Sequence, residues 1–195
     1  DIISYNKDLY NIEALTAYSN FEKLSEQAIM FKPNIVVIGD ENCYFDLKKA
    51  LSGTNIEIAA GKQALVDVAG IHVDWTMIGI VGNAGLEPSM AAAKLGSTIA
   101  IANKECLVAA GSLFMSEIEK NKTTLLPVDS EHNAIFQIIE EKNTKNIEKI
   151  YLTASGGPFL NKDISELNSV TPEQAVAHPN WSMGNKISVD SSTMM

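Results

Sequence analysis

Short apolar runs alternate along the first two thirds of the chain with segments whose apolar residues recur at helical spacing. The apolar runs predict strands at 12–16, 34–39, 56–59, 76–81, 98–102 and 124–126. The segments between them predict helices at 20–31, 44–51, 62–68, 88–95 and 105–120, and residues 1–10 resemble a helix end that enters a turn. This alternation predicts an α/β fold with a Rossmann-like, doubly wound, mainly parallel sheet.

The pattern changes after residue 128. A helical pattern runs to Glu141, and a polar turn then leads to an apolar run at 147–153, which predicts a strand. A helix at 172–177 and a further strand at 187–189 are predicted next. We therefore expect a first domain over 1–128 and the start of an α+β domain over 129–195.

The composition of the 195 residues is that of a globular protein, with 46% hydrophobic and 20% charged residues. The apolar runs are all shorter than the about 18 residues of a membrane span, so we expect a soluble protein with no membrane partner. The chain begins at Asp1 without the pattern of a signal peptide, although a signal could lie before this residue.

The charge pattern limits the possible ligands. A net charge of −9 argues against nucleic acid, whose binding depends on cationic contacts to phosphates, but it allows a small anionic ligand. All 15 cationic residues are lysines, so a phosphate would be held by lysines, hydroxyls, backbone N–H groups or helix N-termini. Cys43 and Cys106 are far apart in sequence, which fits buried thiols in a reducing cytoplasm.

The carboxyl ends of the predicted strands are the places to look for a ligand site, because doubly wound sheets bind ligands there. These junctions are 17–20, 82–85, 103–105 and the motif Pro127-Val128-Asp129-Ser130-Glu131-His132-Asn133. In that motif, Asp129 and Glu131 could supply hard oxygen ligands to a divalent cation. Taken alone, the motif favours capping of the helix that follows, since acidic and hydroxyl side chains suit a helix N-terminus.

The junction at 103–105 places three polar side chains at the end of a buried strand. Lys104 could meet an anionic or enolate oxygen, and Asn103 and Glu105 could bind a ribose or a nicotinamide ring. The alternative for Lys104 is a solvated charge, because lysine is seldom buried without a partner.

The second domain has three further candidate segments. Ser155-Gly156-Gly157 could cradle an anion or form a plain turn. The loop from His178 to Gly184 could be a lid that closes over a ligand, or a loop held by a buried Trp181. Asp190-Ser191-Ser192-Thr193 would supply hydroxyls at the end of the strand predicted at 187–189.

Four motifs, in this order, carry a resemblance to a known family: IANKE, PVDSEHNAIFQ, LTASGGPF and HPNWSMGNKISVDSSTMM. Together they resemble the 1-deoxy-D-xylulose 5-phosphate reductoisomerase family. The resemblance extends over the whole chain and implies an NADPH-dependent enzyme that forms 2-C-methyl-D-erythritol 4-phosphate in isoprenoid precursor biosynthesis. It further implies an NADPH-binding domain over 1–128, a truncated catalytic domain over 129–195, a small phosphorylated sugar substrate, a homodimer when complete, and a location in the bacterial cytoplasm or a plastid-type organelle.

The resemblance also implies roles for individual residues. The metal ligands for Mn²⁺ or Mg²⁺ would be Asp129 and Glu131, and these two with Lys104 and His178 would be the catalytic residues. Substrate contacts would come from Lys104, Ser130, Glu131, Ser155, His178, Trp181 and Ser191. Cofactor contacts would come from Ser19, Asn20, Asn103, Glu105, Met183 and Gly184. Neither Tyr18 nor Ser19 can supply positive charge to an adenosine 2′-phosphate, so the sequence does not predict a strict preference for NADP over NAD.

The resemblance places a Gly-rich loop before Asp1, and an Asn-Lys pair with a third metal-binding Glu after Met195. On this basis we expect residues 1–195 alone to be inactive, and NADPH oxidation by the segment would contradict that expectation. Two rival functions are another Rossmann-type nicotinamide-dependent oxidoreductase and a non-catalytic homologue. Metal-dependent turnover by the full-length protein would separate the second rival from the enzyme.

Overall fold

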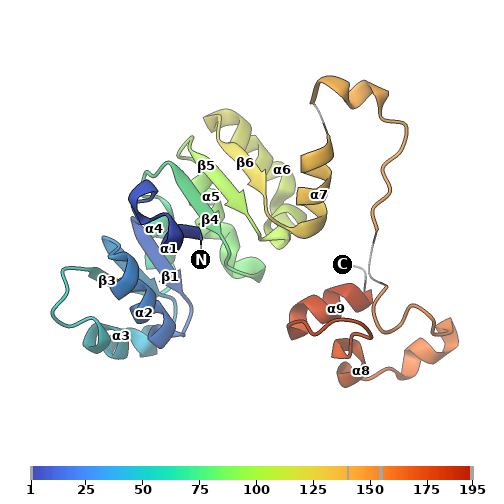
Figure 1. Cartoon of the computed structure of the whole chain (residues 1–195), viewed down its shortest axis with the longest axis horizontal. Coiled ribbons are helices and arrows are strands. Elements are labelled where there is room, and N and C mark those ends of the chain that lie inside the picture. Colours follow the sequence, from blue (N-terminus) through green and yellow to red (C-terminus); the bar gives the residue numbers. More distant parts are fainter. Residues whose placement is uncertain (1, 140, 154–155, 194–195) are drawn as a thin grey trace. The chain divides into compact units, whose positions relative to one another are not determined.

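The structure is a computed structural model that describes residues 2–139, 141–153 and 156–193, without the side chains of Lys7 and of 141–143. The chain divides into two compact units, Asp1–Ile139 and Glu140–Met195 (Figure 1).

The first unit alternates strands and helices as the sequence predicts. Its strands are β1 (Ala14–Ala17), β2 (Ile35–Ile38), β3 (Glu57–Ala60), β4 (Trp75–Ile78), β5 (Thr98–Ile101) and β6 (Thr124–Pro127). Its α-helices are α1 (Ile2–Tyr5), α2 (Phe21–Phe31), α3 (Tyr44–Ala50), α4 (Lys62–Ala69), α5 (Leu86–Ala93), α6 (Lys104–Asn121) and α7 (Ser130–Ile138). Short 3₁₀ helices lie at η1 (Lys7–Leu9), η2 (Glu41–Cys43) and η3 (Gly82–Gly85).

The six strands form two parallel sheets, in the orders β1-β2-β3 and β4-β5-β6. Each pair of neighbouring strands is parallel, and helices provide the crossovers between them. The predicted α/β class and parallel pairing are therefore confirmed, with the strands divided between two three-stranded sheets rather than joined in one.

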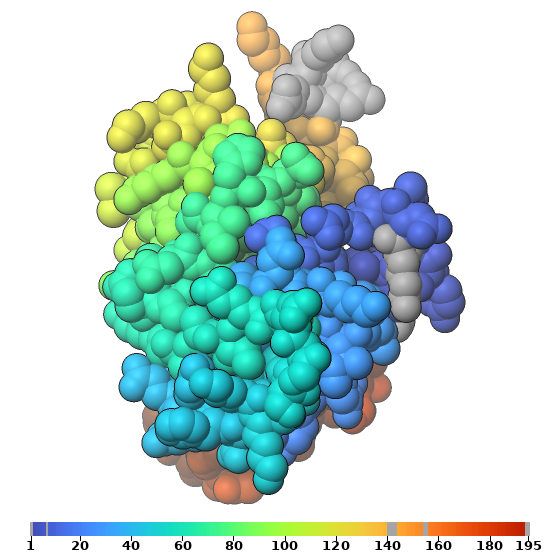
Figure 2. All heavy atoms as spheres, turned by 90° about the vertical axis from the view of Figure 1, so that its left-hand side faces the viewer, coloured from blue at the N-terminus to red at the C-terminus, as the bar shows by residue number. Residues whose placement is uncertain are grey.

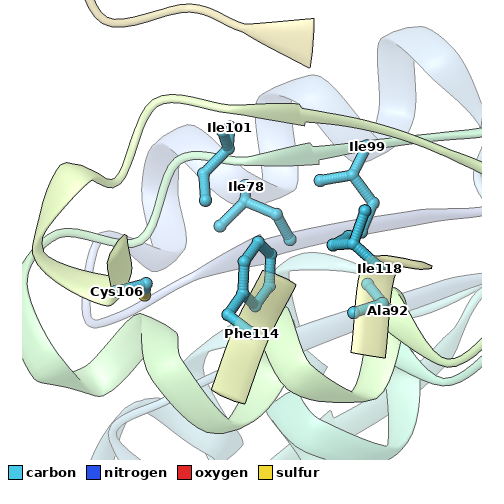
Figure 3. Close-up of a cluster of buried hydrophobic side chains, with 8 residues drawn as sticks. Ile78, Ala92, Ile99, Ile101, Cys106, Phe114 and Ile118 are labelled. Carbon is cyan, nitrogen blue, oxygen red and sulfur yellow. The ribbon is translucent and has the colours of Figure 1, made fainter. Parts of the chain in front are cut away.

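Each sheet has its own hydrophobic core. Leu24 and Ala28 of α2 and Leu47 of α3 pack around the apolar β2, whose continuous Ile-Val-Val-Ile run is typical of a strand covered on both faces. In the other core, Phe114 points from α6 toward Ile78 of β4 (Figure 3). The remaining members of this second core are Ala92, Ala93, Ile99, Ile101, Cys106 and Ile118.

Helix α3 shows how the helical pattern divides buried from exposed side chains. Leu47 is fully buried against the first sheet, while Phe45, two positions away on the helix, is exposed. Figure 2 shows this segment, in cyan, on the surface that faces the viewer. Nowhere in the described ranges is there a helix with the length and apolarity needed to cross a bilayer.

The second unit consists of short helices: η4 (Glu141–Asn146), η5 (Ile164–Ser169), α8 (Pro172–Val176) and α9 (Asn185–Thr193). Helices α8 and α9 are in contact (Figure 1). Gly157 and Ser188 are the buried positions among the residues of this unit whose burial is described. The unit therefore has little apolar core of its own.

Both strands predicted in the second unit are wrong. Residues 147–153 have no regular structure, and residues 187–189 lie inside α9. A strand must pair its backbone groups with a neighbour, and no described segment of this unit pairs with either run. A helix satisfies these groups locally, and α9 adds an ion pair between Lys186 and Asp190, one turn apart.

The domain boundary predicted between residues 128 and 129 divides a cofactor-binding domain from a catalytic domain. This division by function stays a prediction. Helix α7, which follows that boundary, packs on β6 within the first compact unit.

Candidate functional site

The ends of β4, β5 and β6 lie level with one another. Ile78 is paired with Ile101, and Ile101 is paired with Pro127, at the last residue of each strand. The ladder continues one step further, because the N–H of Val128 donates to the carbonyl of Ile101 at 2.9 Å. The residues that follow β5 and β6 therefore emerge at the same edge of the sheet.

Lys104 and Asp129 meet at this edge. The Nζ atom of Lys104 lies 3.9 Å from Oδ2 of Asp129, and their side chains are 24% and 15% exposed. Water screens such a half-buried pair less than it screens a surface pair. The structure thus brings together two of the residues that the strand-end rule singled out from the sequence.

Glu131 is held in its ionised form beside this pair. The Ser130 hydroxyl donates to Oε2 of Glu131 at 2.6 Å, and this bond is the main reason that the pKa of Glu131 is lowered. The backbone N–H of Glu131 lowers the pKa further, burial raises it, and the positive charge of Lys104 lowers it again. A carboxylate that stays ionised is suited to binding a cation.

Asp129 occupies the N-cap position of α7, but its side chain makes no capping hydrogen bond. Capping alone therefore does not account for the Asp129 carboxylate, whose contacts are with Lys104 and His132. The alternative of a cation site, left open by the sequence, is favoured by this geometry.

The donor set fits Mg²⁺ or Mn²⁺. The described part of the chain contains no group of three or more His, Cys, Asp and Glu side chains placed to hold a metal. Two carboxylates are nevertheless enough for a cation of the Mg²⁺ type, which is usually bound by one or two carboxylates and completes its shell with water and substrate oxygens. Asp129 and Glu131 are the two residues that would hold it.

His132 and Asn133 belong to the same motif, but sequence reasoning assigned neither of them a role. Nδ1 of His132 lies 3.9 Å from Oδ1 of Asp129, and Nδ2 of Asn133 donates to the carbonyl of Pro127 at 2.7 Å. The helical spacing could have identified His132, because it lies three residues after Asp129 and so on the same side of the helix end.

Asn103 lies at the end of β5 and is buried, at 2% exposure. Its side-chain amide donates to the carbonyls of Ile80 and Gly82, and its oxygen accepts from the N–H of Cys106 at 2.9 Å. Both amide hydrogens are thus used inside the protein. Glu105, in the first turn of α6, is half-buried at the same sheet edge.

Ser19 and Asn20 lie at the end of β1, in the other sheet. Asn20 caps α2, because its Oδ1 accepts from the N–H of Lys23 at 2.9 Å. The carbonyl of Ser19 accepts a hydrogen bond from the Cys43 thiol at 3.5 Å. The surroundings are acidic: partial burial and the carboxylates of Asp40, Asp46 and Glu22 raise the pKa of Cys43. This junction therefore offers hydroxyl and amide groups, with negative charge nearby.

In the second unit, His178 organises its own loop. Its Nδ1 accepts from the backbone N–H groups of Asn180 and Trp181, at 3.2 and 3.1 Å, so a neutral His178 carries its proton on Nε2. The His178 and Trp181 rings are stacked, with centroids 5.2 Å apart. Trp181 is 59% exposed, so the interpretation of Trp181 as a buried support for the loop is wrong.

Met183 and Gly184 connect this loop to α9, and Gly184 accepts through its carbonyl from both the N–H and the hydroxyl of Ser188. Ser191 lies within α9, which corrects its expected position at a strand end.

The glycine turn at 156–157 packs against α9. Both glycines have positive φ, +83° and +56°. A Cβ atom on Gly157 would lie 2.7 Å from Cα of Ser192 and 2.8 Å from the carbonyl oxygen of Ser191. The structure thus brings this turn together with Ser191, while Ser155 lies outside the described residues.

Comparisons with known proteins identify the family. The sequence profile of 1-deoxy-D-xylulose 5-phosphate reductoisomerase matches residues 1–111, and that of the reductoisomerase C-terminal domain matches residues 125–195. A reductoisomerase of Zymomonas mobilis is 51% identical over 195 residues, which are 100% of this chain and 50% of that protein. A reductoisomerase of Rhizobium meliloti is 52% identical over 188 residues, 96% of this chain and 48% of that protein.

Solved structures agree with the sequences. The Zymomonas mobilis enzyme in complex with NADPH matches with a TM-score of 0.91 at 48% identity, over 100% of this chain and 50% of that one. A reductoisomerase in complex with NADPH, fosmidomycin and magnesium matches with a TM-score of 0.87 at 40% identity, over 99% of this chain and 50% of that one. The chain spans about half the length of the relatives it matches, and it belongs to the 1-deoxy-D-xylulose 5-phosphate reductoisomerase family.

Proposed function

We propose that the full-length polypeptide containing this chain converts 1-deoxy-D-xylulose 5-phosphate to 2-C-methyl-D-erythritol 4-phosphate, with NADPH as reductant and Mg²⁺ or Mn²⁺ as metal. The observation that carries the proposal is the cluster of Lys104, Asp129 and Glu131 at the carboxyl ends of β5 and β6. Family membership supports it, because a relative that matches 100% of this chain binds NADPH, and one that matches 99% of it binds NADPH and magnesium.

Asp129 and Glu131 would hold the metal, which would supply Lewis-acid polarisation of substrate oxygens when bound. Ser130 keeps the Glu131 carboxylate ionised and oriented for this task. Lys104 places a positive charge 3.9 Å from Asp129, where it would offset negative charge that develops on a substrate oxygen.

The second unit would bind the phosphate end of the substrate. Ser155, His178 and Ser191 are the proposed contacts, and the positive-φ glycine turn beside Ser191 allows close backbone approach. Nδ1 of His178 is occupied by its loop, so Nε2 would face the ligand. The exposed Trp181, with Met183 and Gly184 after it in the sequence, would form a lid that excludes water.

The nicotinamide cofactor, which supplies hydride when bound, would lie along the strand ends of the first unit. The proposed contacts are Ser19 and Asn20 at β1 and Glu105 at β5, with Met183 and Gly184 from the loop at 178–184. Asn103 lies at the same strand end as Glu105, but its side-chain amide is already hydrogen-bonded to the carbonyls of Ile80 and Gly82. In this scheme residues 1–128 supply Lys104 and most of the NADPH contacts, and residues 129–195 supply the metal ligands and the other substrate contacts.

The remaining proposals follow from the family. The reaction would serve isoprenoid precursor synthesis by the methylerythritol phosphate pathway. The complete protein would be a homodimer in the cytoplasm of a bacterium, like the organisms of its relatives.

The test is NADPH consumption by the full-length polypeptide with 1-deoxy-D-xylulose 5-phosphate and saturating Mn²⁺, with and without a chelator. We expect turnover that the chelator abolishes, and a loss of at least about a hundredfold in Asp129→Asn, since even outer-shell partners of a metal give ten- to hundredfold losses. Asp67→Asn, an exposed carboxylate on α4, is the matched control and should retain activity.

Two outcomes would contradict the proposal. Unchanged activity of Asp129→Asn at saturating metal would remove the metal-ligand role. A correctly folded full-length protein without turnover would favour the non-catalytic homologue.

A further inference from the structure

The buried residue Asn103 connects two strand-end junctions through its hydrogen bonds. Its amide donates to the carbonyl of Ile80 and, at 2.9 Å, to that of Gly82, both in the loop between β4 and α5. Its oxygen accepts from the N–H of Cys106 in the first turn of α6. One side chain thus holds the loop at 79–85 and the start of α6, which carries Lys104.

A second contact closes the same network from α5. The Ser89 hydroxyl donates to the carbonyl of Gly85 at 2.6 Å and lies 3.6 Å from Sγ of Cys106. Ser89 and Cys106 are both fully buried. The loop is therefore held from two helices by polar groups that are buried or partly buried, where a hydrogen bond left unmade is costly.

Gly85 shows how closely the loop approaches Asn103. A Cβ atom at this position would lie 2.5 Å from Nδ2 of Asn103 and 2.6 Å from the carbonyl oxygen of Ile80. Any larger residue would displace the Asn103 amide or the loop. The close packing at Gly85 and the three hydrogen bonds of Asn103 are separate observations of the same connection.

We propose that Asn103 is a positioning residue that holds the 79–85 loop and the Lys104 end of α6 in one fixed relation. A direct ligand role for its amide would require it to release the carbonyls of Ile80 and Gly82 in the protein interior. The catalytic part of this inference rests on the proposed function, whereas the structural connection does not.

The test compares Asn103→Ser with Asn121→Ser on the same helix. Serine is also a good N-cap residue, so Asn103→Ser keeps an acceptor for the helix end but loses both donors to the loop. Asn121 donates within its own helix to the carbonyl of Glu117 at 2.8 Å and makes no described contact with the loop. Asn103→Asp, which keeps the shape and the acceptor, serves if the serine variant does not fold.

The first measurement is hydrogen exchange of the full-length protein without nucleotide. We expect amides of the 79–85 loop to exchange about tenfold faster in Asn103→Ser, the factor that corresponds to about 1.4 kcal/mol. The last turns of α6 should exchange as in the wild type, and Asn121→Ser should leave the loop unchanged. Wild-type exchange of the loop in both Asn103 variants would overturn the proposal.

The second measurement is steady-state kinetics. Loss of a positioning residue should raise the KM for NADPH and also lower kcat, each by about tenfold. The reason is that the 79–85 loop and Lys104 would no longer be held at fixed positions relative to each other. A rise in the KM alone, with normal exchange of the loop, would instead show a direct ligand. If the wild type has no turnover, the proposed function fails, and hydrogen exchange still decides whether Asn103 fixes the loop.

Discussion

The two units hold their candidate residues in different ways. In the first, Lys104 and Asp129 follow strands whose last residues are paired across the sheet, above a core that includes the fully buried Phe114. In the second, His178 is held by two backbone N–H groups of its own loop and by a stacked, exposed Trp181.

The β4-β5-β6 sheet with its core is thus a rigid frame, whereas the His178 loop is ordered only by contacts within itself. A parallel ladder with a packed core fixes its strand ends from several directions, so the distance between Lys104 and Asp129 depends on many contacts at once. The His178 loop depends on few contacts, close in sequence, and such regions open at low free energy. A rigid metal site and a closing lid need these two properties respectively.

The largest expected effect tests the frame itself. Phe114→Ala should lower the free energy of unfolding by about 3–5 kcal/mol, because it removes a buried ring and leaves a cavity. Trp181→Ala should lower it by less than about 1 kcal/mol, as exposed positions usually do. Urea unfolding, together with exchange of the β5 amides, measures both, and equal losses would contradict the distinction between the units.

Gly157→Ala tests the closest packing within the second unit. The new Cβ would press on Ser191 and Ser192 at an unfavourable positive φ, which should cost about 1–3 kcal/mol and speed amide exchange in α9. Gly53 has a φ of +84°, and no atom lies within 4 Å of the place that an added methyl group would take. Gly53→Ala should therefore carry only the backbone cost of about 1 kcal/mol. Equal costs for the two variants would show that the contact with α9 is unimportant.

His178→Ala should loosen the loop at 178–184. It removes the acceptor of two backbone N–H groups and the stacked ring, a change of about 0.5–1.5 kcal/mol that is confined to the loop. Amides of Asn180 and Trp181 should then exchange faster. His132→Ala, which changes a ring in the first unit, is the control, and faster exchange at Trp181 in that variant would argue against local control by His178.

Ser130→Ala should give the smallest effect. Loss of the hydroxyl donor should raise the pKa of Glu131 toward its ordinary value, which carboxyl NMR titration can follow. The lowered pKa of the folded state contributes stability that is complete above the ordinary glutamate pKa of about 4.3 and is lost as pH falls through the folded value. The variant should therefore lose less stability on acidification, whereas an unchanged pKa would show that Ser130 is not the main cause.

The sequence by itself determined the α/β class, the strands and helices of the first unit, and the proximity of Lys104 and Asp129. Apolar periodicity is a local property, and parallel strand ends meet at one sheet edge whichever side chains follow them. The resemblance of four motifs also identified the family that the comparisons then showed.

Only the tertiary structure decided which polar groups are already used inside the protein. Asn103 is occupied by carbonyls more than 20 residues away in sequence, which no local pattern reveals. The runs at 147–153 and 187–189 have strand-like composition, but a strand forms only where another strand can pair with its backbone groups. The local sequence pattern does not contain the distant hydrogen-bond partners of Asn103, nor does it show whether a second strand lies beside 147–153 or 187–189. The tertiary structure therefore determined the structure at these positions.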